Sequence, residues 1–207
     1  MHARRTLVSV ATLTLIATLS GCGSDHGANH NSSSPSAPAA SSPAETVTGA
    51  AVSLNEADVE FAQGMIAHHE QAIEMAEIAL DPTTQAGPEV LDLAQRIKAA
   101  QDPEVALMTA WLTAAGMSTT MDMSAGHSMA DMEGMMSAED MDSMAAMTGG
   151  DFDAVWLEMM IAHHEGAISQ SKTVQAKGSN ADVLSLAETI ITAQQAEIAE
   201  MRDLLAK

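Results

Sequence analysis

The sequence predicts an all-α fold in which two repeated helical hairpins form a four-helix bundle. Three observations support this prediction. The chain of 207 residues has only two Trp, two Phe and no Tyr, whereas β-sheet proteins are usually richer in aromatic residues. A long motif occurs twice, and apolar residues in both copies recur every three or four positions, as on one face of a helix.

The internal repeat consists of two pairs of matching segments. In the first pair, Phe61-x3-Met65-Ile66-Ala67-His68-His69-Glu70-x-Ala72-Ile73 matches Trp156-x3-Met160-Ile161-Ala162-His163-His164-Glu165-x-Ala167-Ile168 at an offset of 95 residues. In the second, Leu93-Ala94-x2-Ile97-x3-Gln101-x2-Glu104-x3-Met108 matches Leu186-Ala187-x2-Ile190-x3-Gln194-x2-Glu197-x3-Met201 at an offset of 93 residues. The offset changes between the paired segments, where a loop is expected.

The sequence of the first hairpin contains residues that typically begin and end helices. Ser53-x2-Glu56 predicts a capping box that opens the first helix, and Asp81-Pro82 closes it. Pro88 suits the first turn of the second helix, which is expected to end before Gly116. Pro103 stands inside this helix and predicts a kink or a break, because proline removes a backbone hydrogen bond at a cost of about 3 kcal/mol.

The second hairpin follows a long connector. Its first helix is predicted to open near Asp151 or Asp153, and its second helix to start from Ser179-x2-Asp182 and run to the C-terminus. We therefore expect a duplicated domain over residues 53–207, with repeat one at 53–116, a connector at 117–150 and repeat two at 151–207. Two hairpins with one long crossover have ferritin-like connectivity.

The first 52 residues read as a targeting segment and a tether. Residues 1–21 hold Arg4 and Arg5, an apolar stretch and small residues before Cys22, as in a secretory signal peptide. This context resembles the lipobox of bacterial lipoproteins and predicts lipidation at Cys22, with an ordinary signal peptide as the alternative. Residues 22–52 predict a flexible tether. The protein is therefore expected to be exported and lipid-anchored on the extracytoplasmic face of a bacterial membrane.

Charge and cysteine content limit the partners and the metal ligands that the protein can have. The net charge is −20 and becomes −22 when the two arginines leave with the signal peptide, so nucleic acid is not an expected partner. Cys22 is the single cysteine. Once it is acylated, a metal site has to use His, Met, Asp and Glu.

The repeated His pairs are the candidate metal ligands of the helices. These are His68, His69, His163 and His164, each pair with a methionine (Met65 or Met160) one turn before it. Gln101, Glu104, Gln194 and Glu197 share the apolar faces of the partner helices and are expected to meet the His side chains as supporting residues. Two interpretations stay open, namely metal ligation and buried His satisfied by these Gln and Glu.

Familiar catalytic motifs are absent from the repeated segments. Ile73 and Ile168 stand where the zinc-protease motif H-E-x-x-H needs its second His. Met65 and Met160 stand where the Glu-x-x-His motif of di-iron bundles needs Glu. No catalytic residue is therefore assigned.

The connector is rich in methionine. Ten Met lie between residues 117 and 147, at 117, 121, 123, 129, 132, 135, 136, 141, 144 and 147, and no basic residue occurs between Lys98 and Lys172. Thioethers are soft ligands, so Met117, Met121, Met123, Met129, Met132, Met135 and Met136 with His127 favour Cu(I) and also Ag(I). Two alternatives are Met that pack as pliable apolar residues, chiefly Met141, Met144 and Met147, and Met that act as an oxidant sink.

The duplicated M-x2-H-H-x2-A-[IV] and L-A-x2-I-x3-Q-x2-E-x3-M motifs resemble the bacterial "domain of unknown function 305" family over residues 54–206. The resemblance implies a ferritin-like bundle, export and, as for some members, copper binding and tolerance. Matched by motif, it implicates Met65, His68, His69, Met160, His163 and His164. Pro103 departs from the family pattern.

The leading hypothesis is an exported copper-binding lipoprotein that captures, buffers or transfers Cu(I), or Cu(II) at His-rich positions, with an envelope copper protein as partner. A copper or, less favoured, iron oxidoreductase is one alternative. A helical interaction module without metal is the other.

Overall fold

The computed structural model describes residues 53–121 and 132–207, and every regular element within those ranges is helical. Cys22, the predicted signal peptide and tether, Met123, His127 and Met129 lie outside the described residues. The elements are α1 (Glu56–Leu80), the 3-10 turn η1 (Pro82–Thr84), α2 (Pro88–Ala114), α3 (Ala138–Ala145), α4 (Gly149–Lys177) and α5 (Ala181–Leu205). The predicted all-α fold is confirmed.

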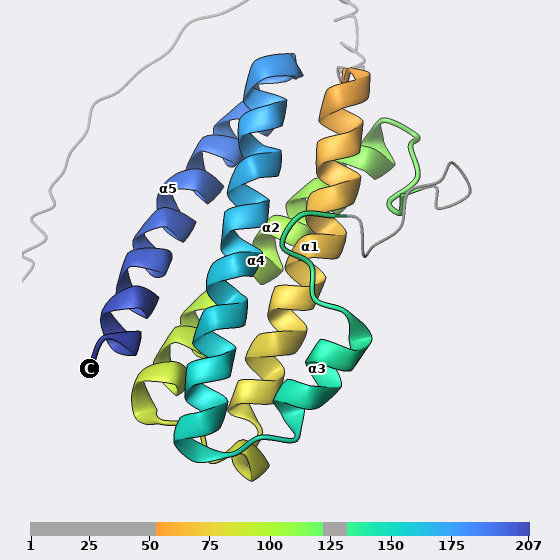
Figure 1. Cartoon of the computed structure of the whole chain (residues 1–207). Helices are drawn as coiled ribbons and strands as arrows, with labels where there is room; N and C mark the ends of the chain where they lie inside the picture. The colour runs from red at the N-terminus through yellow and green to blue at the C-terminus, as the bar shows by residue number, and fades with distance from the viewer. Residues whose placement is uncertain (1–52, 122–131) are drawn as a thin grey trace, which may run out of the picture. The chain divides into compact units, whose positions relative to one another are not determined.

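The four long helices form two antiparallel hairpins (Figure 1). α1 packs along α2 and α4 packs along α5, while the hairpins meet through α1 and α4. The short helix α3 belongs to the connection between the hairpins and packs against α4. The arrangement places the two repeated His pairs on the two helices that face each other.

Two predicted helix caps are wrong by one or two residues. The N-cap of α1 is Asn55, which forms a capping box with Asp58, and Ser53 lies outside it. The N-cap of α5 is Asn180, not Ser179, because the Asn180 side chain accepts from the backbone N–H groups of Asp182 and Val183. Both Asn and Ser are good caps. α4 begins at Gly149, before the start that was predicted near Asp151 or Asp153.

Pro103 does not break α2, which runs through it from Pro88 to Ala114. Apolar residues are buried on both sides of the proline, among them Ile97 before it and Met108 after it. Their packing offsets the lost backbone hydrogen bond, which is of the order of 3 kcal/mol. As a result, Glu104 keeps the register that the repeat predicts.

The hydrophobic core is divided into two clusters. One contains the C-terminal part of α1, from Ala72 onward, and the N-terminal part of α4, from Phe152 to Met160, together with Ile168. The other contains the N-terminal part of α1 up to Ile66, together with Val174 of α4. The four repeated histidines lie between these stretches in both helices. A polar level therefore separates two apolar halves of the bundle.

Two aspartates at equivalent repeat positions tie each hairpin to the turn of the other. Asp58 of α1 is fully buried, and its carboxylate accepts from the backbone N–H groups of Ser179 and Asn180 at 3.1 Å each and from the Ser179 hydroxyl. Asp153 of α4 accepts from the backbone N–H of Gly87 at 3.0 Å. The hairpins are thus locked together at both ends of the α1–α4 interface.

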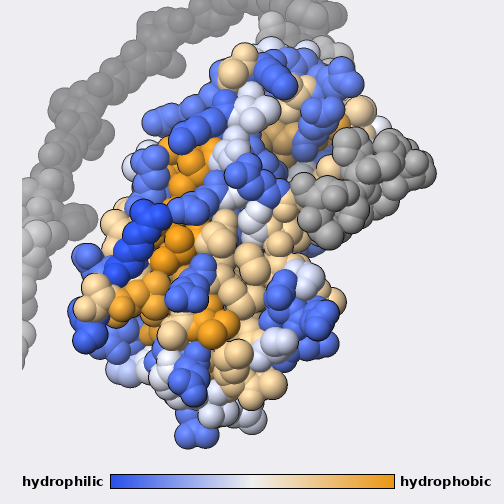
Figure 2. Space-filling model, in the orientation of Figure 1, coloured by the Kyte–Doolittle hydropathy of each residue, from blue (hydrophilic) through white to orange (hydrophobic). Residues whose placement is uncertain are grey.

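Hydrophilic side chains are numerous on the face of the molecule shown in Figure 2. On the face shown in Figure 2, an apolar strip lies over the seam between α4 and α5, flanked by hydrophilic side chains. No helix in the described ranges combines the length and apolar character that crossing a membrane requires.

Replacing Asp58 with Ala should lower the free energy of unfolding by about 3 kcal/mol, because it leaves part-buried N–H groups of the α4–α5 turn without an acceptor. Chemical denaturation followed by circular dichroism measures the change. The exposed Glu60 is the matched control on the same helix, and Glu60→Ala should stay within about 0.5 kcal/mol of wild type. Equal losses in both variants would contradict the assigned role of Asp58.

Candidate metal centre

Four buried imidazoles form the centre of the α1–α4 interface. His68, His69, His163 and His164 are all 0% exposed. The rings of His68 and His163 touch across the interface, with their centroids 3.9 Å apart and their planes tilted by 51°. Because adjacent residues on a helix point about 100° apart, the other His of each pair turns toward its own hairpin partner. We call these four side chains the imidazole row.

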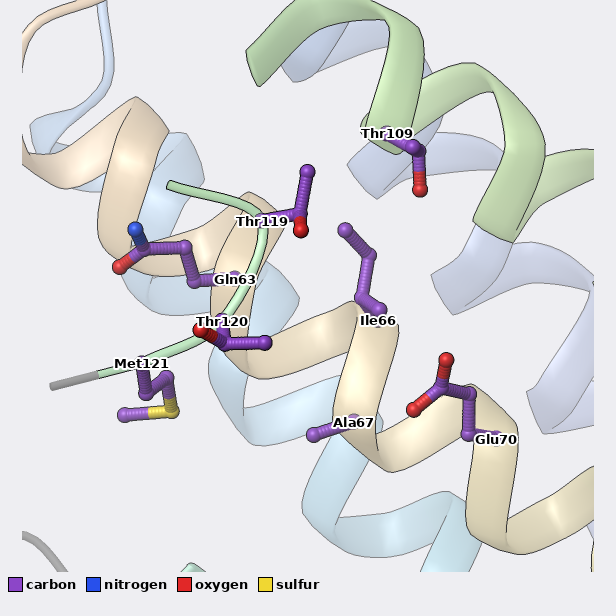
Figure 3. A pocket seen from close by; sticks show the side chains of 8 residues that line it. All are labelled: Gln63, Ile66, Ala67, Glu70, Thr109, Thr119, Thr120 and Met121. Carbon is purple, nitrogen blue, oxygen red and sulfur yellow. The ribbon is translucent and has the colours of Figure 1, made fainter. Parts of the chain in front are cut away.

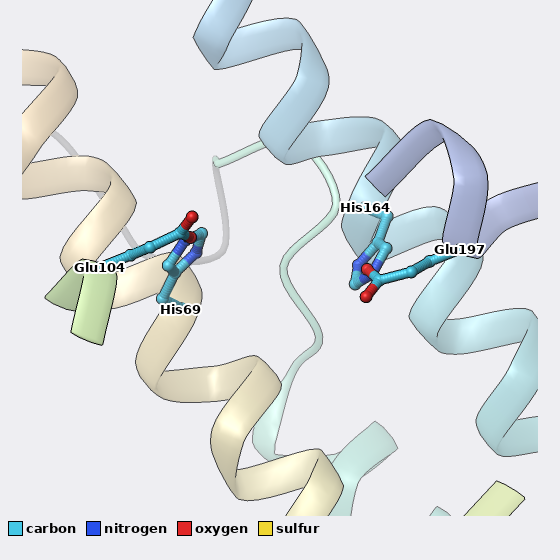
Figure 4. Close-up of polar contacts among 4 residues, drawn as sticks. All are labelled: His69, Glu104, His164 and Glu197. Carbon is cyan, nitrogen blue, oxygen red and sulfur yellow. The ribbon is translucent and has the colours of Figure 1, made fainter. Parts of the chain in front are cut away.

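A glutamate closes each end of the imidazole row. Nε2 of His69 lies 2.8 Å from Oε2 of Glu104, and Nε2 of His164 lies 2.8 Å from Oε2 of Glu197 (Figure 4). The glutamate side chains are 19% and 15% exposed. Solvent therefore reaches both ends of the row but not its middle.

Residues 132–136, here called the strap, cross the bundle beside the row. The strap's Glu133 carbonyl lies 3.2 Å from Nε2 of His68. The Gln71 side chain makes two hydrogen bonds to the Met136 backbone. It donates to the carbonyl at 2.9 Å and accepts from the N–H at 2.7 Å. On the other side, a Cβ at Gly166 would overlap the Glu133 carbonyl, so the strap needs glycine there.

The two residues that hold the strap, Gln71 and Gly166, stand at equivalent positions of the repeat. Gln71 and Gly166 are 95 residues apart and occupy the variable position of the otherwise matching His-His motif. In α1 this position is Gln71, whose side chain hydrogen-bonds to the strap. In α4 it is Gly166, which has no side chain, so the strap backbone can lie close to the helix. One strap thus serves both copies of the motif.

Methionines border the imidazole row on both sides. Met65 and Met160 stand one turn before the two His pairs and are fully buried, and the antiparallel helices place them in the two different core clusters. A Cβ at Gly64 would lie 3.6 Å from Cε of Met132 and 3.8 Å from Sδ of Met121. These two thioethers therefore cover α1 one turn before His68.

The remaining predicted methionines of the connector differ in exposure. Met117 is 45% exposed and Met135 is half-buried. Met136 is half-buried and packs against the core. Met141 and Met144 are buried on the inner face of α3, as the packing alternative expects.

The hydrogen bonds of the row determine which ring nitrogens are free. A carbonyl or an ionised carboxylate can only accept, so Nε2 carries the proton in His68, His69 and His164. Nδ1 of all three is buried without a partner, as are both ring nitrogens of His163. A protonated Nδ1 would be a buried donor with no acceptor, which is costly. The arrangement therefore favours bare Nδ1 lone pairs inside the bundle.

Burial also keeps the central pair free of charge. It lowers the pKa of His68 to about 3, an effect that the bond to the Glu133 carbonyl opposes and the neighbouring His69 and His164 reinforce. Burial, followed by the influence of His68, lowers the pKa of His163 well below its usual value. Both rings are neutral at pH 7, the form in which imidazole binds metals.

Gln101 and Gln194 were predicted as partners of the histidines, and the structure does not pair them. Both are 3% exposed, and their side-chain oxygens have no hydrogen-bond partner. The contacts come from Glu104 and Glu197, one turn further along, which belong to the same predicted set.

The donor set suits a soft or borderline cation. In the described part of the chain, no three His, Cys, Asp or Glu side chains converge as a ready-made metal site. What the row offers is a pair of imidazoles in contact, further bare nitrogens on each side, and buried thioethers a turn away. Imidazole and thioether donors fit copper, and thioether favours Cu(I).

The strap contacts were not predicted from the sequence. The Glu133 contact uses a backbone carbonyl, which no residue type reveals. Gln71 and Gly166 could have been found, because they stand at the one position between Met65 and Ile73 at which the two copies differ. Such a difference indicates that the two copies have different roles at this position.

Acidification should destabilise the protein between pH 6.5 and about 3. In this range the unfolded chain protonates His68 at its ordinary pKa while the folded ring stays neutral, so the unfolded state binds more protons and unfolding becomes easier as the pH falls. Each such group contributes up to about 1.4 kcal/mol per pH unit. Denaturation over this pH range should therefore show a shallower slope for His68→Leu/His163→Leu than for wild type, and equal slopes would contradict the assignment.

Solved structures of two DUF305 proteins and of CopM are similar to this fold. A DUF305 protein of Streptomyces coelicolor assigned as secreted superposes with a TM-score of 0.66 at 29% identity, covering 76% of this chain and 94% of the other. A DUF305 fragment from Deinococcus radiodurans gives 0.65 at 28% identity, covering 73% and 97%. CopM in its Cu(II)-bound form gives 0.58 at 29% identity, covering 72% and 95%.

Other CopM structures contain Cu(I) or silver, or are in the apo form. A search among curated proteins finds no match. The family described as "Domain of unknown function (DUF305)" matches residues 58–205. The chain therefore belongs to the DUF305 family.

Proposed function

We propose that this protein binds copper outside the cytoplasm, with Cu(I) favoured and Cu(II) accepted at the imidazoles. Its role is to capture and buffer the ion or to pass it to an envelope partner. The observation that carries the proposal is the imidazole row, whose bare Nδ1 atoms are buried without partners. Buried polar atoms are normally satisfied, and a metal ion would satisfy these.

The surroundings of the row support a soft ion. Met65 and Met160 add a thioether on each side of it, and Met121 and Met132 cover it one turn away. Because His68 and His163 are neutral at pH 7, no proton has to leave them when a metal binds. The similarity to CopM, which has been crystallised with Cu(I), Cu(II) and silver, supports the same choice of ions.

The proposal also covers where the protein acts in the cell. We infer that residues 1–21 direct export, that Cys22 is lipidated and that residues 22–52 tether the domain of residues 53–207 to the extracytoplasmic face of the membrane. The acidic connector would then attract cations, and its exposed thioethers, such as Met117, would meet copper first. Met123, His127 and Met129 belong to the same proposed set of ligands.

A competition titration with a Cu(I) chelator tests the proposal on the chain without its signal peptide. His68→Leu/His163→Leu should lower the affinity of the tightest site more than about 100-fold, since even the loss of an outer-shell partner costs roughly 10- to 100-fold. The double variant should remain folded, because it removes unpartnered buried polar atoms. Its thermal stability, measured in parallel, separates lost binding from lost structure.

Replacing the seven proposed connector ligands with Leu (Met117, Met121, Met123, Met129, Met132, Met135 and Met136) should remove weaker Cu(I) ions and leave the tightest site. Met141 and Met144, which pack against the bundle, stay unchanged as a control. Wild-type protein that binds Cu(I) only weakly and without defined stoichiometry would overturn the proposal.

A further inference from the structure

The two repeats differ at one charged contact next to the imidazole row. In repeat two, Arg202 of α5 donates to the Glu165 carboxylate of α4 at 2.6 Å. Glu165 directly follows His164. The corresponding residues of repeat one are Glu70, which directly follows His69, and Thr109. Repeat one therefore has the carboxylate but lacks the arginine that binds it.

Glu70 and Glu165 occupy equivalent places in their hairpins. The His69–Glu104 and His164–Glu197 distances are both 2.8 Å, so both hairpins have the same register. Thr109 follows Glu104 by the same interval as Arg202 follows Glu197. Within the described residues, the Glu70 carboxylate takes part in none of the hydrogen bonds or ion pairs.

A cavity of about 450 Å³ lies between Glu70 and Thr109 (Figure 3). It is bounded by α1, by α2 and by the segment that follows α2, and the Glu70 side chain and the Thr109 hydroxyl lie at one end of it. The lining residues are Gln63, Ile66, Ala67, Glu70, Thr109, Thr119, Thr120 and Met121. Gln63 holds the wall in place by donating to the Ser118 carbonyl at 2.8 Å.

We propose that this cavity, the Glu70 pocket, binds an arginine side chain of a partner protein. The repeat shows the ligand chemistry, because the chain's own arginine occupies the matching carboxylate in repeat two. A guanidinium offers several N–H donors, which suit the Glu70 carboxylate and the threonine hydroxyls. Ile66, Ala67 and Met121 offer apolar surface for the stem of the side chain.

The overall charge supports the same partner. With a net charge of −20, the protein attracts basic surfaces and steers them toward it. A metal ion fits the pocket less well, because a single carboxylate with hydroxyls and one thioether mixes hard and soft donors. The pocket therefore favours a basic protein that presents an arginine.

The position of the pocket gives the two ends of the imidazole row different roles. A partner bound at Glu70 would lie beside the His69–Glu104 end, whereas Arg202 occupies the corresponding place at the other end. On the basis of the proposed copper function, we infer that copper passes between the partner and this protein at the His69–Glu104 end. The binding of arginine itself does not depend on copper.

A titration of the metal-free protein with N-acetyl-arginine amide, followed by 1H–15N NMR, tests the pocket. We expect saturable shifts confined to Glu70, Thr109 and residues 119–121, and none with the uncharged citrulline analogue. Thr109→Arg should fill the pocket with an internal arginine and lower the affinity more than about tenfold, as should Glu70→Gln.

Thr113→Arg is the matched control, because it adds the same charge at an exposed position of the same helix and should change the affinity by less than about twofold. The same spectra show whether each variant is folded. Shifts spread over the acidic surface, an equal effect of Thr113→Arg, or a response of the pocket to Ag(I) but not to arginine would overturn the proposal. Since no metal is present in the arginine titration, its failure would leave the copper proposal standing.

Discussion

The burial of four imidazoles at one level of the bundle is the constraint on which the rest of the structure depends. Histidine at the α1–α4 interface has to be neutral or paired, because an isolated charge in this position is costly. Glu104 and Glu197 pair the outer rings, and burial keeps the inner rings, His68 and His163, unprotonated. Two apolar clusters on either side keep water away. The unpartnered nitrogens carry a cost in folding free energy, which the proposed binding of copper would offset.

Duplication gives the bundle a nearly symmetric frame, and the two copies differ around the imidazole row. The frame is nearly symmetric, with matching His–Glu pairs and with Asp58 and Asp153 each holding the opposite turn. A single strap cannot be symmetric, so it bonds to His68 and leaves both nitrogens of His163 without a partner. The variable position of the motif, Gln71 in one copy and Gly166 in the other, secures it. The site thus has one covered side and two unequal ends.

Sequence periodicity was sufficient for the hairpins and for the level at which the histidines lie, because helical spacing directly fixes which residues share a face. The continuity of α2 through Pro103 was not predictable, since it depends on packing at both ends of the helix. The caps were misplaced for a similar reason. Ser53-x2-Glu56 and Asn55-x2-Asp58 both fit a capping box, and the added bonds from Asp58 to the α4–α5 turn distinguish them. Gln101 was chosen beside Glu104 because spacing alone cannot tell which side chain reaches His69.

The protonation of the imidazole row provides the most direct test of the account. Long-range 1H–15N spectra of the histidine rings at pH 7 should show the proton on Nε2 of His68, His69 and His164 and a neutral ring for His163. Addition of Cu(I) should then shift the Nδ1 resonances of the row. Protons found on Nδ1 in the metal-free protein, or Nδ1 resonances that do not respond to Cu(I), would contradict the proposal that the row binds copper through its Nδ1 atoms.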